Sequence, residues 1–110
     1  MTTDCLFCKI IAGDIPSESI YEDDNVIVFN DIKPMAEVHF LIVPKLHLES
    51  LKICDEAHQT LLGKMLLLAP KLAEEQGLKG FKTLINTGRE GGQEVFHIHV
   101  HVFGGGLPTV

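Results

Sequence analysis

The stretch "GGQEVFHIHVHVFGGG", Gly91 to Gly106, carries the strongest structural signal, because three of the chain's six histidines recur there at every second residue. His97, His99 and His101 alternate with aliphatic residues. Successive side chains of a β-strand leave on opposite faces. The pattern therefore predicts a strand over Val95–Phe103, with the three imidazoles on one face and the aliphatic side chains on the other.

Such a row of histidines is open to three interpretations: a metal site, a site that acts on an anion, or a polar strand face. Side chains two residues apart on a strand are about 6.5–7 Å apart, whereas nitrogens that bind one metal lie within about 2.1 Å of it. Three histidines in a straight row therefore fit one metal poorly, and one histidine joining ligands from elsewhere fits better. The preceding Gly91-Gly92-Gln93 lets the backbone approach a ligand and aim N–H groups at an anion.

The rest of the chain predicts an α+β fold: an antiparallel sheet of about five strands with one long helix and a short N-terminal helix. The hairpin strands are separated by the turn residues Asp23-Asp24-Asn25, and Asp55 and Gly77 are placed as caps of the long helix. Pro70, inside that helix, predicts a kink. The expected elements are a helix within Asp4–Asp14, strands Ser19–Glu22, Val26–Asn30, Val38–Lys45 and Phe81–Gly88, and a helix reaching about Gln76.

Bulk properties narrow the class of protein. A chain of 110 residues, 45% of them hydrophobic, fits a single domain over residues 1–110. A net charge of −6 argues against binding nucleic acid through its phosphates. No apolar run approaches the roughly 20 residues that a membrane span needs. An acid and two cysteines within the first eight residues do not resemble a signal peptide, so a cytoplasmic location is expected.

The three cysteines, Cys5, Cys8 and Cys54, are an odd set. A reducing compartment disfavours disulfides. The close pair Cys5 and Cys8 therefore indicates a metal or redox site, and the alternative is that both pack as small hydrophobic residues.

At the histidine row the sequence resembles the histidine triad (HIT) family. His97 to Phe103 matches the family signature His-φ-His-φ-His-φ-φ, in which φ is apolar. The similarity extends over nearly the whole chain, through "FCKIIAGDIPS", "FNDIKPMAEVHFLIVPKLH" and "NTGREGGQEVFHIHVHVFGG". The branch that it resembles most is the nucleoside phosphoramidase, or Hint-like, group.

The resemblance implies an enzyme that hydrolyses purine nucleoside phosphoramidates, such as AMP joined to an amine. His99 would attack the α-phosphorus and form a nucleotidyl-histidine, His101 would protonate the leaving group, and His97 would orient the site. Asp31 would bind the ribose hydroxyls. Asn86, Gly92, Gln93 and the backbone N–H of Glu94 would line the phosphate. The base would lie between Phe7, Ile10, Phe29 and Ile32, for which ordinary core packing is an equal alternative.

The resemblance also implies a structural zinc ion held by Cys5, Cys8, His47 and His97, and a homodimer formed through the long helix and a sheet edge. Zinc is not needed for the reaction itself. One departure from the animal members is Glu94, which stands where they have a serine, so its carboxylate is expected to point away from the phosphate. His39 and His58 receive no function. Two other functions stay open: hydrolysis of dinucleoside polyphosphates, and a zinc-stabilised nucleotide-binding module without relevant turnover.

Overall fold

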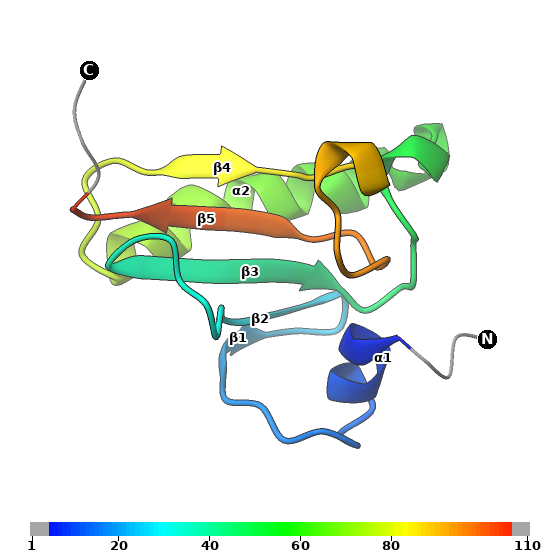
Figure 1. Ribbon diagram of the computed structural model, residues 1–110, viewed down its shortest axis with the longest axis horizontal. Helices are drawn as coiled ribbons and strands as arrows, with labels where there is room; N and C mark the ends of the chain where they lie inside the picture. The colour runs from blue at the N-terminus through cyan, green and yellow to red at the C-terminus, as the bar shows by residue number, and fades with distance from the viewer. Residues whose placement is uncertain (1–4, 107–110) are drawn as a thin grey trace.

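The computed structural model describes residues 5–106, in which a five-stranded sheet is flanked by helices on both faces (Figure 1). The strands pair in the order β1-β2-β3-β5-β4, and every neighbouring pair is antiparallel. The α+β prediction, with one long and one short helix, is confirmed. The elements are α1 (Leu6–Ile11), β1 (Ser19–Glu22), β2 (Val26–Asn30), β3 (Val38–Pro44), α2 (Gln59–Glu75), β4 (Lys82–Leu84) and β5 (Val100–Gly104), with short 3-10 turns η1 (Leu51–Ile53), η2 (Glu56–His58) and η3 (Arg89–Gly91).

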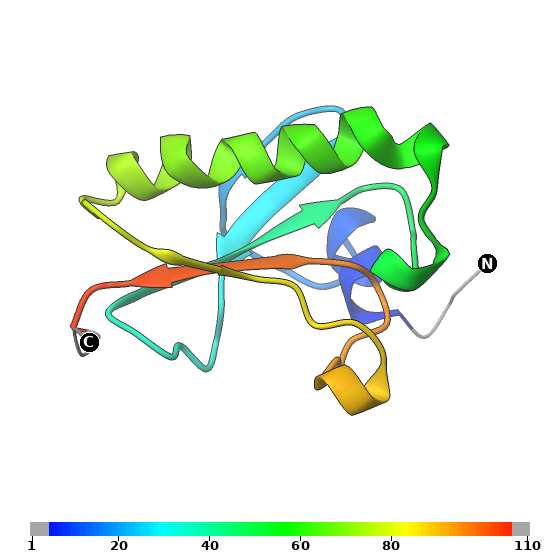
Figure 2. The same ribbon diagram turned by 90° about the horizontal axis from the view of Figure 1, so that it is seen from above.

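The two faces of the sheet bury different sets of side chains. Alternate residues of β2, β3 and β5 pack under α2, and they include Val28, Phe40 and Val100. The intervening residues form a second cluster with Phe7 of α1, in which Ile27, Phe29 and Leu41 take part. Figure 2 shows α2 running along one face of the sheet as a single continuous helix. Pro70 lies inside this helix, which spans Gln59–Glu75 without a break. The face opposite α2 is therefore the one that α1 partly covers, and it carries the site.

Several predicted boundaries are corrected by the structure. β5 begins at Val100 instead of Val95, because the N–H of Ile98 donates to the carbonyl of Leu48 at 2.7 Å, outside the strand ladder. β4 is only the three residues Lys82–Leu84, an exposed edge strand, and does not extend over Phe81–Gly88. The strand predicted to Lys45 ends at Pro44.

The helix starts are also refined. Asp55 does act as a cap, but of the 3-10 turn η2, and its backbone N–H donates in return to His58 Nδ1 at 3.0 Å. The α-helix proper starts at Gln59. Asp4, where the short helix was expected to begin, lies outside the described residues. Within residues 5–106, no helix is long and apolar enough to cross a membrane.

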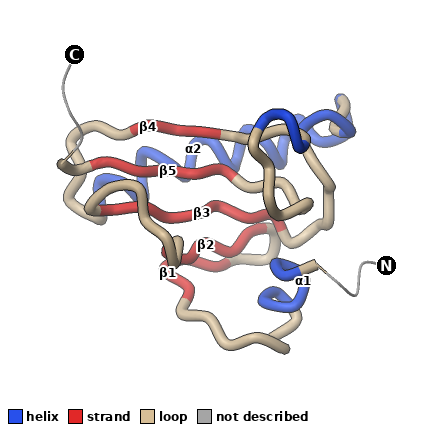
Figure 3. The backbone as a smooth tube through the Cα atoms, viewed as in Figure 1, coloured by secondary structure: helices blue, strands red, loops and turns tan. Residues whose placement is uncertain are grey.

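The candidate site is assembled at one end of this sheet. The short helix α1, the loop after β3 and the loop that carries η3 all lie at the end where β3 finishes and β5 starts (Figure 1, Figure 3). Antiparallel pairing of β3 with β5 brings residues far apart in the chain into register there, with Ile42 opposite Val100 and Leu41 opposite His101.

Candidate active site

The predicted histidine row exists, although only its last member lies on a strand. His97 and His99 belong to the irregular segment Val95–His99, and His101 lies on β5. The aliphatic residues Val100 and Val102 enter the core under α2, as the alternation predicted. His97 is fully buried and His99 is 7% exposed, so the row is a largely desolvated strip instead of a solvated strand face.

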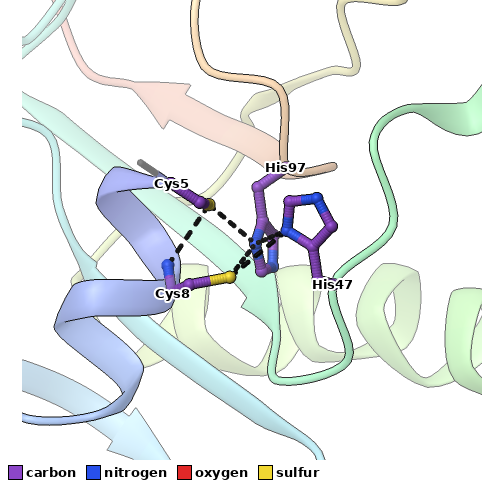
Figure 4. Close-up of side chains that lie close together, drawn as sticks. All are labelled: Cys5, Cys8, His47 and His97. Carbon is purple, nitrogen blue, oxygen red and sulfur yellow. Dashed lines mark hydrogen bonds between the residues drawn. The ribbon is translucent and has the colours of Figure 1, made fainter. Parts of the chain in front are cut away.

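One end of the row forms a compact cluster with two cysteines. Cys5, Cys8, His47 and His97 each offer one ligand atom, and these atoms all lie within 4.8 Å of one another. The Nδ1 atoms of His47 and His97 are 3.1 Å apart, and Cys8 Sγ lies 3.2 Å from His47 Nδ1 and 3.5 Å from His97 Nδ1. The side chains point toward one common centre from α1, the loop after β3 and the segment before β5 (Figure 4).

These spacings fit a tetrahedral metal. Zinc bonds of about 2.3 Å to sulfur and 2.0–2.1 Å to nitrogen place tetrahedral ligand atoms about 3.3–3.8 Å apart. His97 Nε2 lies 2.7 Å from the carbonyl of Pro44, which can only accept, so Nε2 carries the proton and Nδ1 keeps its lone pair. Burial lowers the pKa of His97 to about 4, so the ring is neutral. A cation at the centre would relieve the close approach of the two Nδ1 atoms.

The two cysteines face the same cluster. Cys5 is the N-cap of α1, and its Sγ accepts from the N–H of Cys8 at 3.3 Å. Cys5 Sγ also lies 3.4 Å from His97 Nδ1. His47 Nε2, in contrast, is buried and has no hydrogen-bond partner among the described residues. The polar group that orients His47 must therefore be at its other nitrogen, which faces the cluster. Packing of Cys5 and Cys8 without a metal stays the alternative, and the metal content of the protein decides between the two.

His99, the middle histidine of the row, has one ring nitrogen without a proton. His99 Nδ1 lies 2.7 Å from the carbonyl oxygen of His97, and a carbonyl only accepts, so Nδ1 carries the proton. Burial lowers the pKa of His99, against the opposing effects of the His97 carbonyl and Asp31, so the ring is neutral. Its Nε2 therefore holds an unprotonated lone pair. This is the state in which an imidazole is a nucleophile.

His101 is held by a partner that sequence reasoning missed. The N–H of Met35 donates to His39 Nδ1 at 3.0 Å, so the proton of neutral His39 lies on Nε2. That Nε2–H faces His101 Nδ1 at 2.9 Å, which leaves the proton of neutral His101 on its own Nε2. Burial, with His99 and His39 as neighbours, lowers the pKa of His101 to about 4. His39 thus fixes which nitrogen of His101 is a donor.

Asp31 closes this end of the row. Its Oδ2 lies 3.5 Å from His39 Nε2 and 3.9 Å from His101 Nδ1, while Oδ1 accepts from the N–H of Lys33 at 2.8 Å. Asp31, His39 and His101 are spaced closely enough to suggest a second metal site. The tautomer of His39 argues against a metal there. A metal bound to His39 Nε2 would move the ring proton to Nδ1, where it would face the N–H of Met35, and two donors would then point at each other. This group is a hydrogen-bonded chain.

The glycine-rich loop is braced differently from the prediction. The N–H groups of Gly91, Gly92 and Gln93 bond to carbonyls of the same loop, so they do not form the expected anion cradle. The buried Gln93 side chain accepts from the N–H of Gly88 and donates to the carbonyls of Glu49 and Val95. Its amide is therefore a brace of the loop and is not offered to a phosphate. The backbone at position 92 has a φ of 85°, which favours glycine over residues that carry a Cβ.

The phosphate contacts that the resemblance implied for Glu94 and Asn86 are not tested by the structure. The Glu94 side chain is exposed, and its backbone N–H has no hydrogen-bond partner within residues 5–106. Asn86 lies beside Gly92, with its Oδ1 3.8 Å from where a Cβ on that glycine would be. Contact of either residue with a phosphate stays a prediction.

The four predicted base-binding residues separate into two groups. Phe7 and Phe29 are buried together, with ring centroids 5.5 Å apart, and Ile10 packs against their cluster. Ile32 is 91% exposed, so core packing does not explain it. Phe7 also meets the edge of His99 at 5.0 Å between ring centroids, with the ring planes at 90°. Phe7 is therefore in contact with the nucleophile candidate.

The depressed pKa of His101 predicts a dependence of stability on pH. His101 titrates near 4 in the folded protein and near 6.5 when unfolded. Between these values the unfolded chain binds more protons, so the free energy of unfolding should rise with pH and fall on acidification. We expect the free energy of unfolding of His101→Gln to depend less steeply on pH between about 4 and 6.5. Urea unfolding at several pH values in this range measures the dependence. Equal slopes in both proteins would contradict the assignment.

The fold and the site define a class of proteins in which an antiparallel sheet presents a row of neutral histidines beside a glycine-rich loop. The family model described as "Scavenger mRNA decapping enzyme C-term binding" matches residues 4–109. The chain belongs to the histidine triad family. Protein HitA of Neisseria gonorrhoeae is 54% identical over 101 residues, which span 91% of this chain and 94% of that protein. The purine nucleoside phosphoramidase of Escherichia coli K12 is 42% identical over 107 residues, covering 96% and 90%.

Solved structures agree with this assignment. A HIT family hydrolase from Legionella pneumophila Philadelphia 1 superposes with a TM-score of 0.92 at 42% identity, covering 96% of each chain. A zinc-bound histidine triad family protein from Mycobacterium smegmatis has a TM-score of 0.83 at 33% identity, covering 96% of this chain and 77% of that one. The Legionella pneumophila structure is described as a hydrolase, and the Mycobacterium smegmatis structure is described with zinc.

Proposed function

We propose that this protein hydrolyses purine nucleoside phosphoramidates through a covalent nucleotidyl-His99 intermediate. The observation that carries the proposal is the hydrogen bond from His99 Nδ1 to the carbonyl of His97, which leaves Nε2 unprotonated on a buried ring. The name of the Escherichia coli relative supports the substrate class.

The first half-reaction forms one bond and breaks one. His99 Nε2 attacks the α-phosphorus, the bond from phosphorus to the amine breaks, and AMP becomes attached to His99. The product is a phosphoramidate of histidine, in which the P–N bond is labile enough for water to finish the reaction. In this proposal the N–H of Glu94 and the side chain of Asn86 donate to the phosphate oxygens and stabilise the charge that develops there.

The leaving amine needs a proton, and the pair His39 and His101 is suited to provide it. In the free protein the pair is neutral. An anionic phosphate beside His101 joins Asp31 as a second negative charge, which raises the pKa of the pair. The proton taken up there passes from His101 to the amine as the P–N bond breaks. Water then attacks the phosphorus, returns a proton to the pair and releases AMP, leaving His99 neutral again.

Mass spectrometry tests the proposal directly. Mixing the protein with an aminoacyl-AMP-type phosphoramidate and quenching with base is expected to give a peptide that carries AMP on His99. Comparing amide and ester leaving groups then separates this function from hydrolysis of dinucleoside polyphosphates, which requires faster turnover with a nucleotide leaving group. Unmodified His99 at all times during turnover would contradict the covalent route.

Asp31 gives a prediction about binding. Its Oδ2 lies 3.5 Å from His39 Nε2 and 3.9 Å from His101 Nδ1. We propose that this carboxylate also accepts hydrogen bonds from the ribose hydroxyls. We expect Asp31→Ala to raise KM by about tenfold or more, because hydrogen bonds to a charged group contribute about 1.5–3 kcal/mol. Steady-state kinetics with the ribosyl and the 2′-deoxyribosyl substrates checks this. A variant that still discriminates between the two sugars as wild type does would contradict the ribose contact.

We also propose that Cys5, Cys8, His47 and His97 bind one zinc ion. Two thiolates and two imidazoles form a complete tetrahedral set, so a bound ion would rigidify the fold and would have no open position for substrate. The zinc-bound relative supports this choice of metal.

We propose, further, that two chains form a dimer through α2 and the β4 edge. β4 ends the sheet, so one side of its backbone is not paired within the described residues. Leu66 and Leu67 of α2 and Leu84 of β4 are exposed apolar side chains, and Leu67 is 75% exposed. Light scattering is expected to give the mass of two chains, and Leu67→Asp should shift it toward one. A single-chain mass for the wild type at micromolar concentration would refute the dimer.

A further inference from the structure

Cys5 and Cys8 lie close enough to each other to form a covalent bond. Their Sγ atoms belong to the four cluster atoms that all lie within 4.8 Å of one another, and both side chains point to the same centre (Figure 4). The N–H of Cys8 donates to Cys5 Sγ at 3.3 Å. The sulfur atoms of a disulfide are about 2.0 Å apart. A short movement of one side chain is therefore enough to join the two sulfurs.

The backbone at Cys5 permits this movement. Cys5 is the N-cap of α1 and has a ψ of 116°, so its backbone is extended and lies outside the helix, whereas Cys8 is in the first turn. Cβ atoms three residues apart on a helix are about 5–6 Å from each other, and those of a disulfide are about 3.5–4.5 Å apart. A shift of about 1–2 Å at the extended residue closes this difference.

The rest of α1 can stay in place during such a shift, because apolar packing also holds this helix to the sheet. Phe7 is buried in a cluster with side chains of β2 and β3, namely Ile27, Phe29, Leu41 and Val43. Ile10 and Ile11 pack against the same cluster. Most of this packing is made by residues other than the cysteines, so the two thiols can react in the folded protein.

The two cysteines are also accessible from solvent. Cys5 and Cys8 are partly exposed, whereas His97, the histidine that both sulfurs approach, is fully buried. A small water-soluble oxidant can therefore reach the sulfurs. An accessible thiol that has a second cysteine beside it is the kind that oxidises reversibly to a disulfide.

We propose that Cys5 and Cys8 form an oxidative modification site, at which a peroxide converts the pair to a disulfide and the cluster loses its capacity to hold a metal. His47 and His97 would be the ligands left in the cluster, and two ligands do not complete a tetrahedral zinc site. The loss of metal rests on the zinc site proposed above, whereas the formation of the disulfide rests only on the positions of the two cysteines.

The oxidation is a two-electron reaction that consumes one molecule of peroxide. One thiolate attacks a peroxide oxygen and breaks the O–O bond, which gives a sulfenic acid and a hydroxide ion. The second thiolate attacks the sulfenic sulfur, forms the S–S bond and displaces a second hydroxide ion. Two protons from solvent convert both hydroxide ions to water. A dithiol reductant reverses the change by thiol–disulfide exchange.

The test uses the wild-type chain loaded with zinc, hydrogen peroxide as the oxidant and a chromogenic zinc chelator. The tryptic peptide that ends at Lys9 contains both cysteines. We expect this peptide to lose about 2 Da and to resist alkylation, while the zinc content falls from about one to about zero per chain. The circular dichroism should stay that of the folded protein, and a dithiol with added zinc should restore the metal.

Three results would overturn the proposal: sulfinic acid on either cysteine without a bridge, a bridge that leaves the zinc bound, or an oxidation that unfolds the chain. The matched control is Cys54→Ser, which removes the cysteine outside the cluster. This variant should release zinc at the wild-type rate. A Cys54→Ser protein that keeps its zinc under peroxide would assign the reactive thiol to Cys54 instead.

None of these measurements depends on turnover, so failure of the oxidation site and failure of the proposed hydrolysis are separate results. Wild-type protein that binds no zinc would refute the zinc site and the release of metal, and the mass of the peptide would still decide whether the disulfide forms. An unchanged peptide mass under excess peroxide would refute the modification site itself.

Discussion

Replacing His99 with alanine is expected to lower turnover by roughly 10⁴-fold or more, because loss of a covalent nucleophile leaves only binding and electrostatic contributions. Folding and nucleotide affinity should change little, since the ring makes one hydrogen bond, to the His97 carbonyl, and packs beside the rings of Phe7 and His101. Single-turnover kinetics with trapping of the intermediate measures both the rate and the covalent species.

The control for this experiment is His58→Ala, which removes a histidine from the 3-10 turn η2, outside the row. It should retain wild-type turnover and the AMP adduct. A His99→Ala protein that hydrolyses substrate within about tenfold of wild type would mean that His99 is not the nucleophile. A chain that binds nucleotide equally well with and without His99, and never turns it over, would instead be a binding module.

Loss of the metal is the second change with a large expected effect. Structural zinc sites contribute on the order of 10 kcal/mol of binding free energy. Purified protein should therefore contain about one zinc per chain, and Cys8→Ser should bind it much more weakly. For a domain of this size, each kcal/mol of lost stability lowers Tm by about 4 °C. We therefore expect the Tm of Cys8→Ser to be lower than that of the wild type by about 10 °C or more. Elemental analysis and thermal denaturation measure the two quantities.

The third cysteine provides the matched control for this loss. Cys54 is not a member of the cluster, and its thiol donates to the carbonyl of Ser50 at 3.5 Å. Cys54→Ser should keep both the zinc and the melting temperature. Metal-free wild-type protein with an unchanged melting temperature would show that the four residues only pack against one another.

The elements that sequence reasoning located well are those with local causes. The strands Ser19–Glu22 and Val26–Asn30 have the predicted boundaries, because the turn between them is fixed by Asp23. Its Oδ1 accepts from the N–H groups of Asn25 and Val26 at 2.8 and 3.0 Å. Such bonds lie within three residues of one another, so the residue types alone indicate them.

The start of β5 was predicted wrongly because alternation of polar and apolar residues occurs both in a strand and in an irregular extended segment. His97, Ile98 and His99 alternate in the sequence as a strand does, and all three side chains are buried. Their backbone bonds, however, go to Leu48 and to His99 Nδ1 instead of a neighbouring strand. Periodicity reports which face a side chain takes, and it does not report where the backbone hydrogen bonds go.

His39 could not be found from its local pattern. It looks like one polar residue in an apolar strand, and its importance depends on the β3–β5 register, which places His39 opposite Phe103 and near His101. No short-range feature encodes that register. Gln93 is similar, since its task follows from carbonyls of Glu49 and Val95 that the fold brings together.

The position of β5 has a consequence for how the protein folds. β5 lies between β3 and β4 although it follows both in the chain. β1, β2 and β3 can therefore pair early, but β3, a nearly all-apolar strand, then has an open edge. Open apolar edges are templates for pairing with other chains. Because β5 carries His101 and covers that edge, catalytic competence and protection from aggregation arise in the same folding step. A chain truncated before Val100 is expected to aggregate, and it is not expected to fold into an enzyme with reduced turnover.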